Sequence, residues 1–496
     1  MGDGGEEIRN GFMAESLKNK TIKGTFWSAA DALFGQGVTF IVGIILARLL
    51  SPEEYGLIGI CTIFTTILTG VVDSGFSTAL IRRKDVTDDD YNTMFITNLV
   101  VSFVLFFALY LCAPAIAFFF ERPELLSVVR TMGLLLIFQA LSITQVTILT
   151  KRIDFKTKTK ASLFSAICSG IVGVVMAFSG FGVWALVGQQ LSKQLLYTAS
   201  LWVLNKWWPK FTFSKDSFHY MWGFGWKMML SGLLSNIWTQ LYQVVVGKCY
   251  SPATLGQYSK SREYGNIFSS NITTIIQRVT YPVLAEVQDN KDRMIAAYRK
   301  VIKVTMFVTA IVMFFLGAIS EPFIYCLIGP KWHQAATFLP LMCISMSLYP
   351  LHAINLNMLQ VQGRSDIFLY LEIAKKFVSV IPLLLGIFVD IYWMLWGSIV
   401  AGVIQYFMNS YYTGKDLKYS SWMQIKDVVP SYTVAIIVAL SVYFLKYLPL
   451  SNWIILPLQV LVGGTVILTV GEVCKMEEYM ELKNIVQSAL SKMKKQ

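Results

Sequence analysis

The sequence is poor in charge and in the residues that build catalytic and metal sites. Charged residues make up 15% of the 496 residues, against about a quarter in an ordinary globular domain. Only three histidines occur, His219, His333 and His352, far apart and outside any metal-ligand motif. The seven cysteines form no C-x-x-C pair and no spacing typical of a zinc site or a disulfide framework. These absences argue against a soluble globular protein, and we expect no catalytic constellation, no metal site and no cofactor.

The sequence contains several long apolar stretches without a charged residue. The segments Tyr91–Phe120, Thr131–Thr150 and Ala161–Ser192 contain no charged residue. A helix needs roughly 20 apolar residues to cross the hydrocarbon core of a bilayer. With 55% hydrophobic residues and a mean hydropathy of +0.56, the chain is predicted to be an all-α polytopic membrane protein.

Apolar runs and turn residues together predict about fourteen transmembrane helices. The predicted spans lie near residues 24–47, 55–80, 91–120, 125–150, 161–179, 182–204, 217–247, 255–285, 299–320, 334–361, 366–389, 391–413, 429–446 and 452–472. The acidic run Asp88–Asp90 is interpreted as the solvated start of the third span.

Basic residues are unevenly divided between the two predicted sides of the membrane. One side carries most of the Lys and Arg residues of the loops, and the other has only Arg48, Arg122, Lys248, Lys331 and Lys446. Basic loops face the cytoplasm. We therefore expect both termini to be cytoplasmic, and the net charge of +12 needs no nucleic-acid partner.

A repeat is indicated by two similar turns. Arg48, Ser51, Pro52 and Gly56 are matched by Lys248, Ser251, Pro252 and Gly256 at a constant offset of 200 residues. Six predicted spans separate the copies, so both halves insert in the same direction, as in a parallel repeat. Chance punctuation by turn residues is the alternative. The predicted division is a cytoplasmic segment 1–23, a six-helix bundle 24–204, a linker 205–216, a second six-helix bundle 217–413, two additional helices within 414–472 and a cytoplasmic tail 473–496.

Polar side chains line one face of the seventh span. Asn236, Thr239, Gln240 and Gln243 follow the spacing i, i+3, i+4 and i+7. Such a stripe either lines a wet cavity or forms hydrogen bonds between helices. In the first span, Asp31 is a candidate for ion coupling or for pairing with a cavity lysine, and both interpretations stay open.

Several basic residues fall inside predicted spans, where an unpaired charge is costly and therefore marks a candidate site. Glu372 with Lys375 or Lys376, and Lys260 with Glu263, are spaced to pair along their own helices, which is the alternative explanation. After such pairing the inventory stays basic, and a cationic cavity favours an anionic cargo. The candidate cations are Lys193, Lys227, Lys260, Arg262, Arg278 and Lys375.

Short motifs in both halves resemble those of the Wzx-type polysaccharide flippases, which belong to the multidrug/oligosaccharidyl-lipid/polysaccharide exporter superfamily. The motifs are Gly24–Ser28 (GTFWS), Leu46–Gly56 (LARLLSPEEYG), Asp73–Phe76 (DSGF), Ala79–Arg83 (ALIRR), Leu255–Ser259 (LGQYS) and Tyr281–Leu284 (YPVL). The resemblance covers essentially the whole chain. Where relatives commonly continue the eighth-helix motif with Arg-Ala-Tyr, this chain has Arg262-Glu263-Tyr264, and the extra acid weakens the local positive charge.

This resemblance implies transport of an undecaprenyl-pyrophosphate-linked oligosaccharide across a bacterial inner membrane, for O-antigen, capsule or exopolysaccharide assembly. Alternating access would carry the head group through a cationic central cavity, and the last two helices would contribute to a groove for the lipid tail. Polysaccharide assembly proteins are the partners that the resemblance suggests. In this interpretation Lys227, Lys260, Arg262, Arg278 and Lys375 attract the pyrophosphate, while Asn236, Gln240 and Gln243 bind sugars.

Other functions remain as alternatives. A lipid II flippase moves a chemically similar cargo, and a cation-coupled multidrug exporter of the same superfamily would want an acidic cavity. A membrane glycan polymerase or ligase would be expected to carry a large outer loop, and no predicted loop is long enough. The chain is therefore predicted not to be an enzyme.

Overall fold

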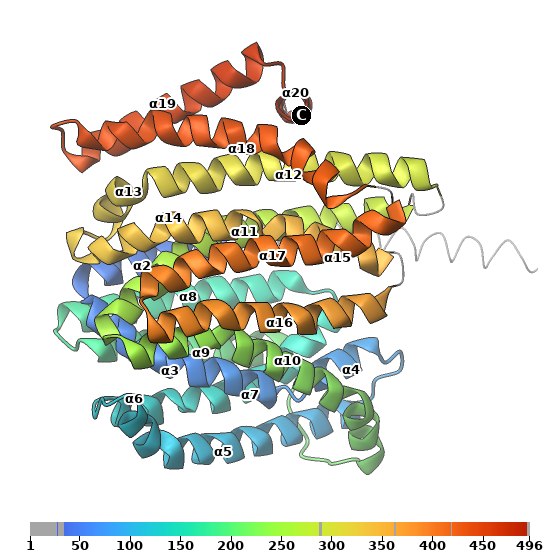
Figure 1. Cartoon of the computed structure of the whole chain (residues 1–496). Helices are drawn as coiled ribbons and strands as arrows, with labels where there is room; N and C mark the ends of the chain where they lie inside the picture. Colours follow the sequence, from blue (N-terminus) through green and yellow to red (C-terminus); the bar gives the residue numbers. More distant parts are fainter. Residues whose placement is uncertain (1–26, 28–33, 287–289, 362–363, 418, 494–496) are drawn as a thin grey trace, which may run out of the picture. The chain divides into compact units, whose positions relative to one another are not determined.

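The computed structural model describes residues 27, 34–286, 290–361, 364–417 and 419–493 (Figure 1). Within these ranges the regular elements are all helical. Nine helices of the described residues are long and apolar enough to cross a membrane. The predicted all-α, multi-pass membrane architecture is thereby confirmed, while the count of fourteen spans stays a prediction.

The chain divides into two compact units, residues 1–256 and 257–496, and the predicted six-helix division stays a prediction. The first unit contains α2 (Gln36–Leu49), α3 (Pro52–Val72), α4 (Phe76–Arg82), α5 (Asp88–Phe119), α6 (Leu125–Met132), α7 (Leu134–Lys151), α8 (Phe155–Phe178), α9 (Val183–Asn205), α10 (Lys215–Cys249) and the start of α11 (Pro252–Glu286). After the remainder of α11, the second unit contains α12 (Lys291–Ala318), α13 (Ser320–Leu327), η2 (Pro330–Trp332), α14 (His333–Ser347), α15 (Tyr349–Val361), α16 (Ser365–Phe388), α17 (Ile391–Leu417), α18 (Ser421–Tyr443), η3 (Phe444–Tyr447), α19 (Asn452–Val473) and α20 (Glu477–Met493).

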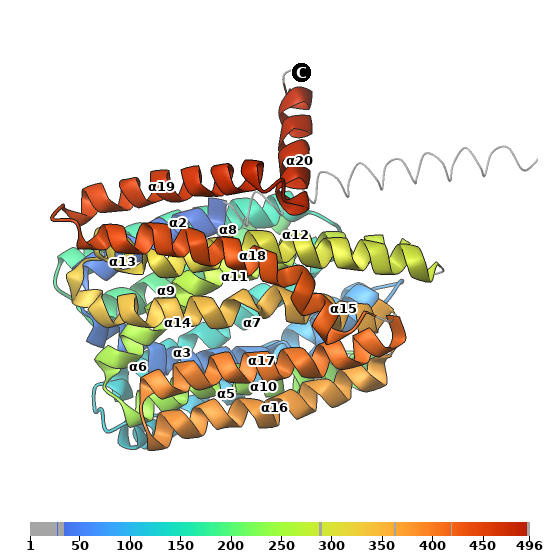
Figure 2. The same cartoon turned by 45° about the horizontal axis from the view of Figure 1, so that its top comes forward.

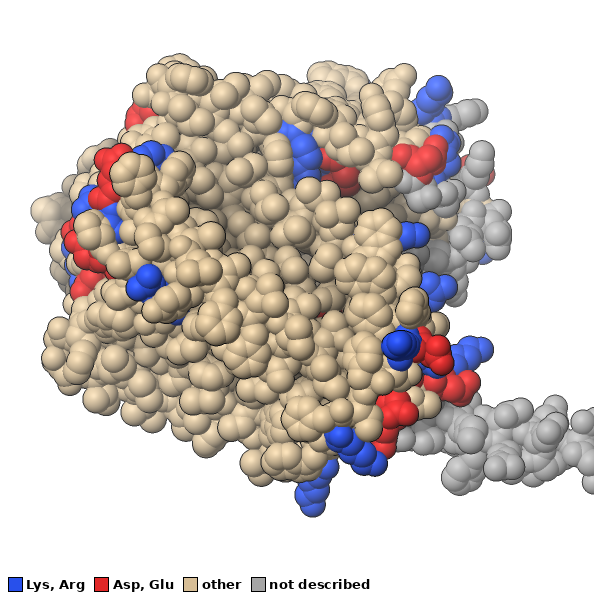
Figure 3. Space-filling view, turned by 90° about the horizontal axis from the view of Figure 1, so that it is seen from below, with Lys and Arg blue, Asp and Glu red and all other residues tan. Residues whose placement is uncertain are grey.

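Charged side chains are unevenly spread over the surface. On the face drawn in Figure 3 they gather mainly at the two sides and leave a broad belt with few charges between them. Large apolar side chains such as Phe107, Leu111 and Phe118 of α5 are exposed. In water this exposure would be unfavourable, whereas in a bilayer these side chains contact lipid.

Local sequence determines where helices of the first unit begin and end. The Ser51 hydroxyl accepts a hydrogen bond from Glu54 N at the start of α3, and the Glu54 carboxylate accepts one from Ser51 N, which forms a capping box. Between α3 and α4, Ser74 and Gly75 have φ values of 51° and 70°. Ser77 donates a hydrogen bond to Asp73 across this break. Asp73 thereby holds the two sides of the break together.

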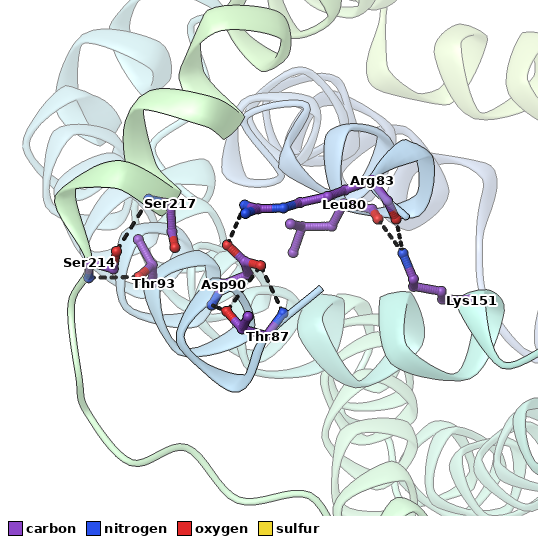
Figure 4. A network of polar contacts seen from close by, with 8 residues as sticks. All are labelled: Leu80, Arg83, Thr87, Asp90, Thr93, Lys151, Ser214 and Ser217. Carbon is purple, nitrogen blue, oxygen red and sulfur yellow. Dashed lines mark hydrogen bonds and ion pairs between the residues drawn. The ribbon is translucent and has the colours of Figure 1, made fainter. Parts of the chain in front are cut away.

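A polar network fixes the start of α5 and α10 in the first unit (Figure 4). Asp90 is buried and accepts hydrogen bonds from Thr87 N at 2.9 Å and from Arg83 Nη1 at 2.7 Å. Lys151 Nζ donates to the Leu80 carbonyl at 2.9 Å, which caps the end of α4. Ser214 N, just before α10, donates to Thr93 Oγ1 at 3.0 Å. The acidic run is therefore a helix start, as predicted.

The two predicted repeat turns meet each other in the first unit. A Cβ placed on Gly56 would lie 1.8 Å from the Pro252 carbonyl oxygen, and one placed on Gly256 would lie 1.9 Å from the Pro52 carbonyl oxygen. The contact is reciprocal, because Gly56 of the first turn meets Pro252 of the second, and Gly256 of the second turn meets Pro52 of the first. Equivalent segments related by a twofold axis make contacts of this kind. This crossing supports the predicted repeat, and no side chain fits in it.

In the second unit, α12 packs against α18. Arg299 of α12 donates two hydrogen bonds to the carboxylate of Asp427 on α18. The same carboxylate accepts a hydrogen bond from the Tyr419 hydroxyl at 2.7 Å. α16 and α17 lie side by side in both views (Figures 1 and 2).

The last helix, α20, runs crosswise to α19 and packs on α12 (Figure 2). Lys303 of α12 pairs with Glu477 at 3.0 Å, and Lys300 pairs with Glu481 at 2.5 Å. Tyr479 packs against Gly471 of α19. Apolar contacts of Tyr479 and Leu482 with the buried cluster of α12 and α18 and these two ion pairs together dock α20.

Acid should weaken the docking of α20. The hydrogen bond from Lys303 lowers the pKa of the Glu477 carboxyl below its ordinary value of 4.5, so this contribution to docking is complete above 4.5 and is lost as pH falls through the lowered pKa. We expect amide-exchange protection of 477–493, corrected for intrinsic exchange, to fall on acidification. Glu477→Gln should already be less protected at neutral pH. Equal protection of the wild type at neutral pH and at a pH below the lowered pKa of Glu477 would contradict this account of docking.

Candidate functional site

A cavity of about 470 Å³ opens inside the first unit among α3, α7, α8 and α9. Its walls are mainly hydroxyl and amide side chains. The lining residues are Thr62, Thr65, Thr66, Thr69, Leu135, Gln139, Ser162, Ser165, Gln190, Lys193, Gln194 and Tyr197. Such a lining can exchange hydrogen bonds with a polar ligand that replaces water.

Four threonines of α3 supply one wall. They follow the spacing i, i+3, i+4 and i+7, which places them on one face of the helix. Thr62 Oγ1 donates to the Ile58 carbonyl at 2.8 Å, and Thr69 Oγ1 donates to the Thr66 carbonyl at 3.0 Å. Since the hydroxyls of Thr62, Thr65 and Thr69 donate within the helix, their oxygens remain available as acceptors.

Lys193 of α9 gives the cavity its charge. Its Nζ lies 3.4 Å from Thr39 Oγ1 of α2, and its side chain is half-buried. Among the described lining residues, Lys193 is the one that carries a formal charge. An ammonium among hydroxyl and amide groups is suited to a ligand that combines sugar hydroxyls with phosphate oxygens.

Four of the sequence-predicted site residues lie on α10 in the first unit, outside the cavity wall. Lys227 is exposed, with Nζ 5.9 Å from the ring centroid of its neighbour Trp226. Asn236 packs against α3, because a Cβ on Gly70 would lie 2.6 Å from its Nδ2. Gln240 is 8% exposed, and its Oε1 has no hydrogen-bond partner among the described residues. Gln243 is half-buried.

Apart from Asp31, the other predicted site residues belong to the second unit. Lys260 pairs with Glu263 at 2.8 Å, and Lys375 pairs with Glu372. These are the pairs along one helix that the sequence allowed, and they reduce the positive charge of this set. Arg262 is half-buried on α11. Asp31 and the side chain of Arg278 lie outside the described residues.

Sequence analysis named Lys193 as a cation and missed the wall around it. The signal was present: Thr62, Thr65, Thr66 and Thr69 have the spacing that identified the polar stripe of α10. Cargo binding by the α10 and second-unit residues stays a prediction.

Comparison with known proteins gives relatives over most of the chain. It is 25% identical to the succinoglycan biosynthesis transport protein ExoT of Rhizobium meliloti (strain 1021), over 68% of each chain. It is 24% identical to the teichuronic acid biosynthesis protein TuaB of Bacillus subtilis (strain 168), over 72% of this chain and 74% of that one.

Among solved structures, the lipid II flippase MurJ in an inward closed conformation has a similar fold. The TM-score is 0.70 at 16% sequence identity, with 93% of this chain and 99% of that chain covered. The family model described as polysaccharide biosynthesis protein matches residues 45–337, more than half of the chain. The resemblance found in the sequence motifs is thereby confirmed, and the chain belongs to the polysaccharide biosynthesis protein family.

Proposed function

We propose that this protein is a flippase that moves an undecaprenyl-pyrophosphate-linked oligosaccharide across the bacterial inner membrane. The observation that carries the proposal is the polar cavity of the first unit, with Lys193 as its charged lining residue, in a multi-pass member of a polysaccharide biosynthesis family. The names of ExoT and TuaB also refer to the synthesis of extracellular or cell-wall polysaccharides.

Transport in this proposal makes and breaks no covalent bond. Hydroxyl and amide groups of α3, α7 and α9 exchange hydrogen bonds with the sugars, and Lys193 attracts the pyrophosphate. Because water is partly excluded from the cavity, this attraction is stronger than it would be in bulk solvent. Alternating access then releases the head group on the other side, while the lipid chain stays in the bilayer.

The proposed function also implies how the protein is oriented in the membrane. Basic loops on one predicted side place both termini in the cytoplasm, where the lipid-linked oligosaccharide is made. Transfer toward the outer leaflet then supplies the machinery that assembles O-antigen, capsule or exopolysaccharide, and proteins of that machinery are the expected partners.

The lining of the cavity distinguishes among cargoes. A cation-coupled exporter of cationic drugs would be expected to place a carboxylate where the described wall has Lys193. Lipid II carries sugars on a pyrophosphate like the proposed cargo, so the fold shared with MurJ leaves it as the second candidate. Complementation separates the two.

The proposed function is tested by deleting the gene in its own host. We expect loss of the surface polysaccharide and accumulation of its lipid-linked precursor on the cytoplasmic side, with restoration by the wild-type gene. A host in which lipid II accumulates instead would favour the second candidate. Unchanged polysaccharide and unchanged precursor would refute both.

A further inference from the structure

A second concave surface lies in the second unit, between α16 and α17, and it is apolar. Its volume is about 500 Å³, and its lining is mainly aromatic and aliphatic. Tyr370 and Leu371 of α16 form one side, and Ile404, Phe407, Met408 and Tyr411 of α17 form most of the other. Gln405 Nε2 of α17 donates a hydrogen bond to Ser379 Oγ of α16 at 2.8 Å and joins the two helices.

The helix face of α17 that lines the groove carries a cation one turn beyond Tyr411. Ile404, Phe407, Met408, Tyr411 and Lys415 follow the spacing i, i+3, i+4, i+7 and i+11, so they share one helix face. Lys415 lies near the end of α17 and is exposed. An apolar groove with an ammonium one helical turn beyond it matches a lipid whose chain ends at a phosphate.

The shape of the groove narrows the choice of lipid. It is one channel between two neighbouring helices, which suits a single chain better than the two acyl chains of a phospholipid. Its tyrosine, phenylalanine and methionine side chains offer polarisable surface to a branched, unsaturated chain. The loops at this end of α16 and α17 are predicted to be cytoplasmic, which places the groove in the inner leaflet.

We propose that this groove binds the polyprenyl chain of the lipid-linked cargo, with the first phosphate at Lys415, before the head group enters the transport cavity. The inference rests on the proposed function and names the place where cargo is first held. The groove lies on α16 and α17; the contribution of the last two helices that the family resemblance implies stays a separate prediction.

A photoactivatable polyprenyl monophosphate tests the site in the full-length protein, reconstituted in phosphatidylethanolamine and phosphatidylglycerol. We expect crosslinks in peptides of α16 and α17 that unlabelled polyprenyl phosphate competes away. Lys415→Gln should weaken binding about fivefold, the effect of one basic residue near an anionic surface. Lys426→Gln, which removes another exposed lysine at the predicted cytoplasmic side, should not change it.

Three results would overturn the site. The first is crosslinks confined to other helices. The second is competition by added phosphatidylglycerol as strong as that by unlabelled polyprenyl phosphate, which would identify an ordinary lipid contact. The third is equal binding of the probe by Lys415→Gln and Lys426→Gln. Transport is measured separately in the same vesicles. A wild type that transports without labelling α16 or α17 would defeat the groove alone. A wild type that is labelled there without transporting would defeat the proposed flippase and leave a lipid-binding groove.

Discussion

Replacement of Gly56 by Ala is expected to reduce transport about ten- to a hundredfold, while the protein still inserts into the membrane. The new methyl group would meet the Pro252 carbonyl oxygen, which lies 1.8 Å from the Cβ position. That atom belongs to the backbone, so α3 and the start of α11 must separate. Overpacking of this kind costs about 1–3 kcal/mol, which disfavours the arrangement in which the two helices cross.

The reciprocal contact makes the prediction sharper. Gly256→Ala should have a similar effect, since its Cβ meets the Pro52 carbonyl oxygen at 1.9 Å. Once one substitution has separated the helices, the second adds little, so the double variant should be clearly less impaired than the two single effects combined. Gly232→Ala on α10 is the matched control, because no atom of the described residues lies within 4 Å of its Cβ position. Two results would contradict a contact shared by the two glycines. One is transport at the wild-type rate by Gly56→Ala, and the other is a double variant whose impairment equals the two single effects combined.

Replacement of Lys193 by Gln is expected to reduce transport by about ten- to a hundredfold. Hydrogen bonds to a charged group contribute about 1.5–3 kcal/mol, and Gln keeps a donor while it removes the charge. The proposed pyrophosphate partner would be lost, whereas the hydroxyl and amide wall would remain. The initial rate of transport of the lipid-linked oligosaccharide in vesicles measures this effect.

Two further variants separate charge from packing. Lys193→Arg keeps a cation and should retain a substantial part of the rate. Lys160→Gln removes an exposed lysine from α8 and should transport like the wild type. If Lys193→Gln transported normally, or if Lys193→Arg were as impaired as Lys193→Gln at equal protein amount, the cation would not be the cargo contact that we propose.

Features that depend on local sequence were predictable. The apolar run of α5 predicted a span, and the acidic run Asp88–Asp90 predicted its start. Pairing of Lys260 with Glu263 follows from their spacing on one helix. Reciprocal contact of Gly56 and Gly256 agrees with the offset of 200 residues between the two turns.

The two concave surfaces could not be predicted in the same way, because each depends on which helices become neighbours. Thr62 and Gln190 are far apart in sequence, and only the packing of α3 near α9 brings both to one wall. A threonine in a span often satisfies its own hydroxyl on the preceding turn, as Thr62 does, so the stripe alone does not reveal a cavity. Similarly, Lys415 gains its significance from the groove between α16 and α17.

The central claim is that this protein moves a lipid-linked oligosaccharide across a bilayer through a polar site that contains Lys193. It is tested most directly by placing a fluorescent polyprenyl-pyrophosphate oligosaccharide in liposomes with the purified protein and following its accessibility to an impermeant quencher. We expect the wild type to expose the inner-leaflet pool, Lys193→Gln to do so about ten- to a hundredfold more slowly, and protein-free liposomes to retain it. Wild-type vesicles that behave like protein-free ones, or a Lys193→Gln variant as fast as the wild type, would contradict the claim.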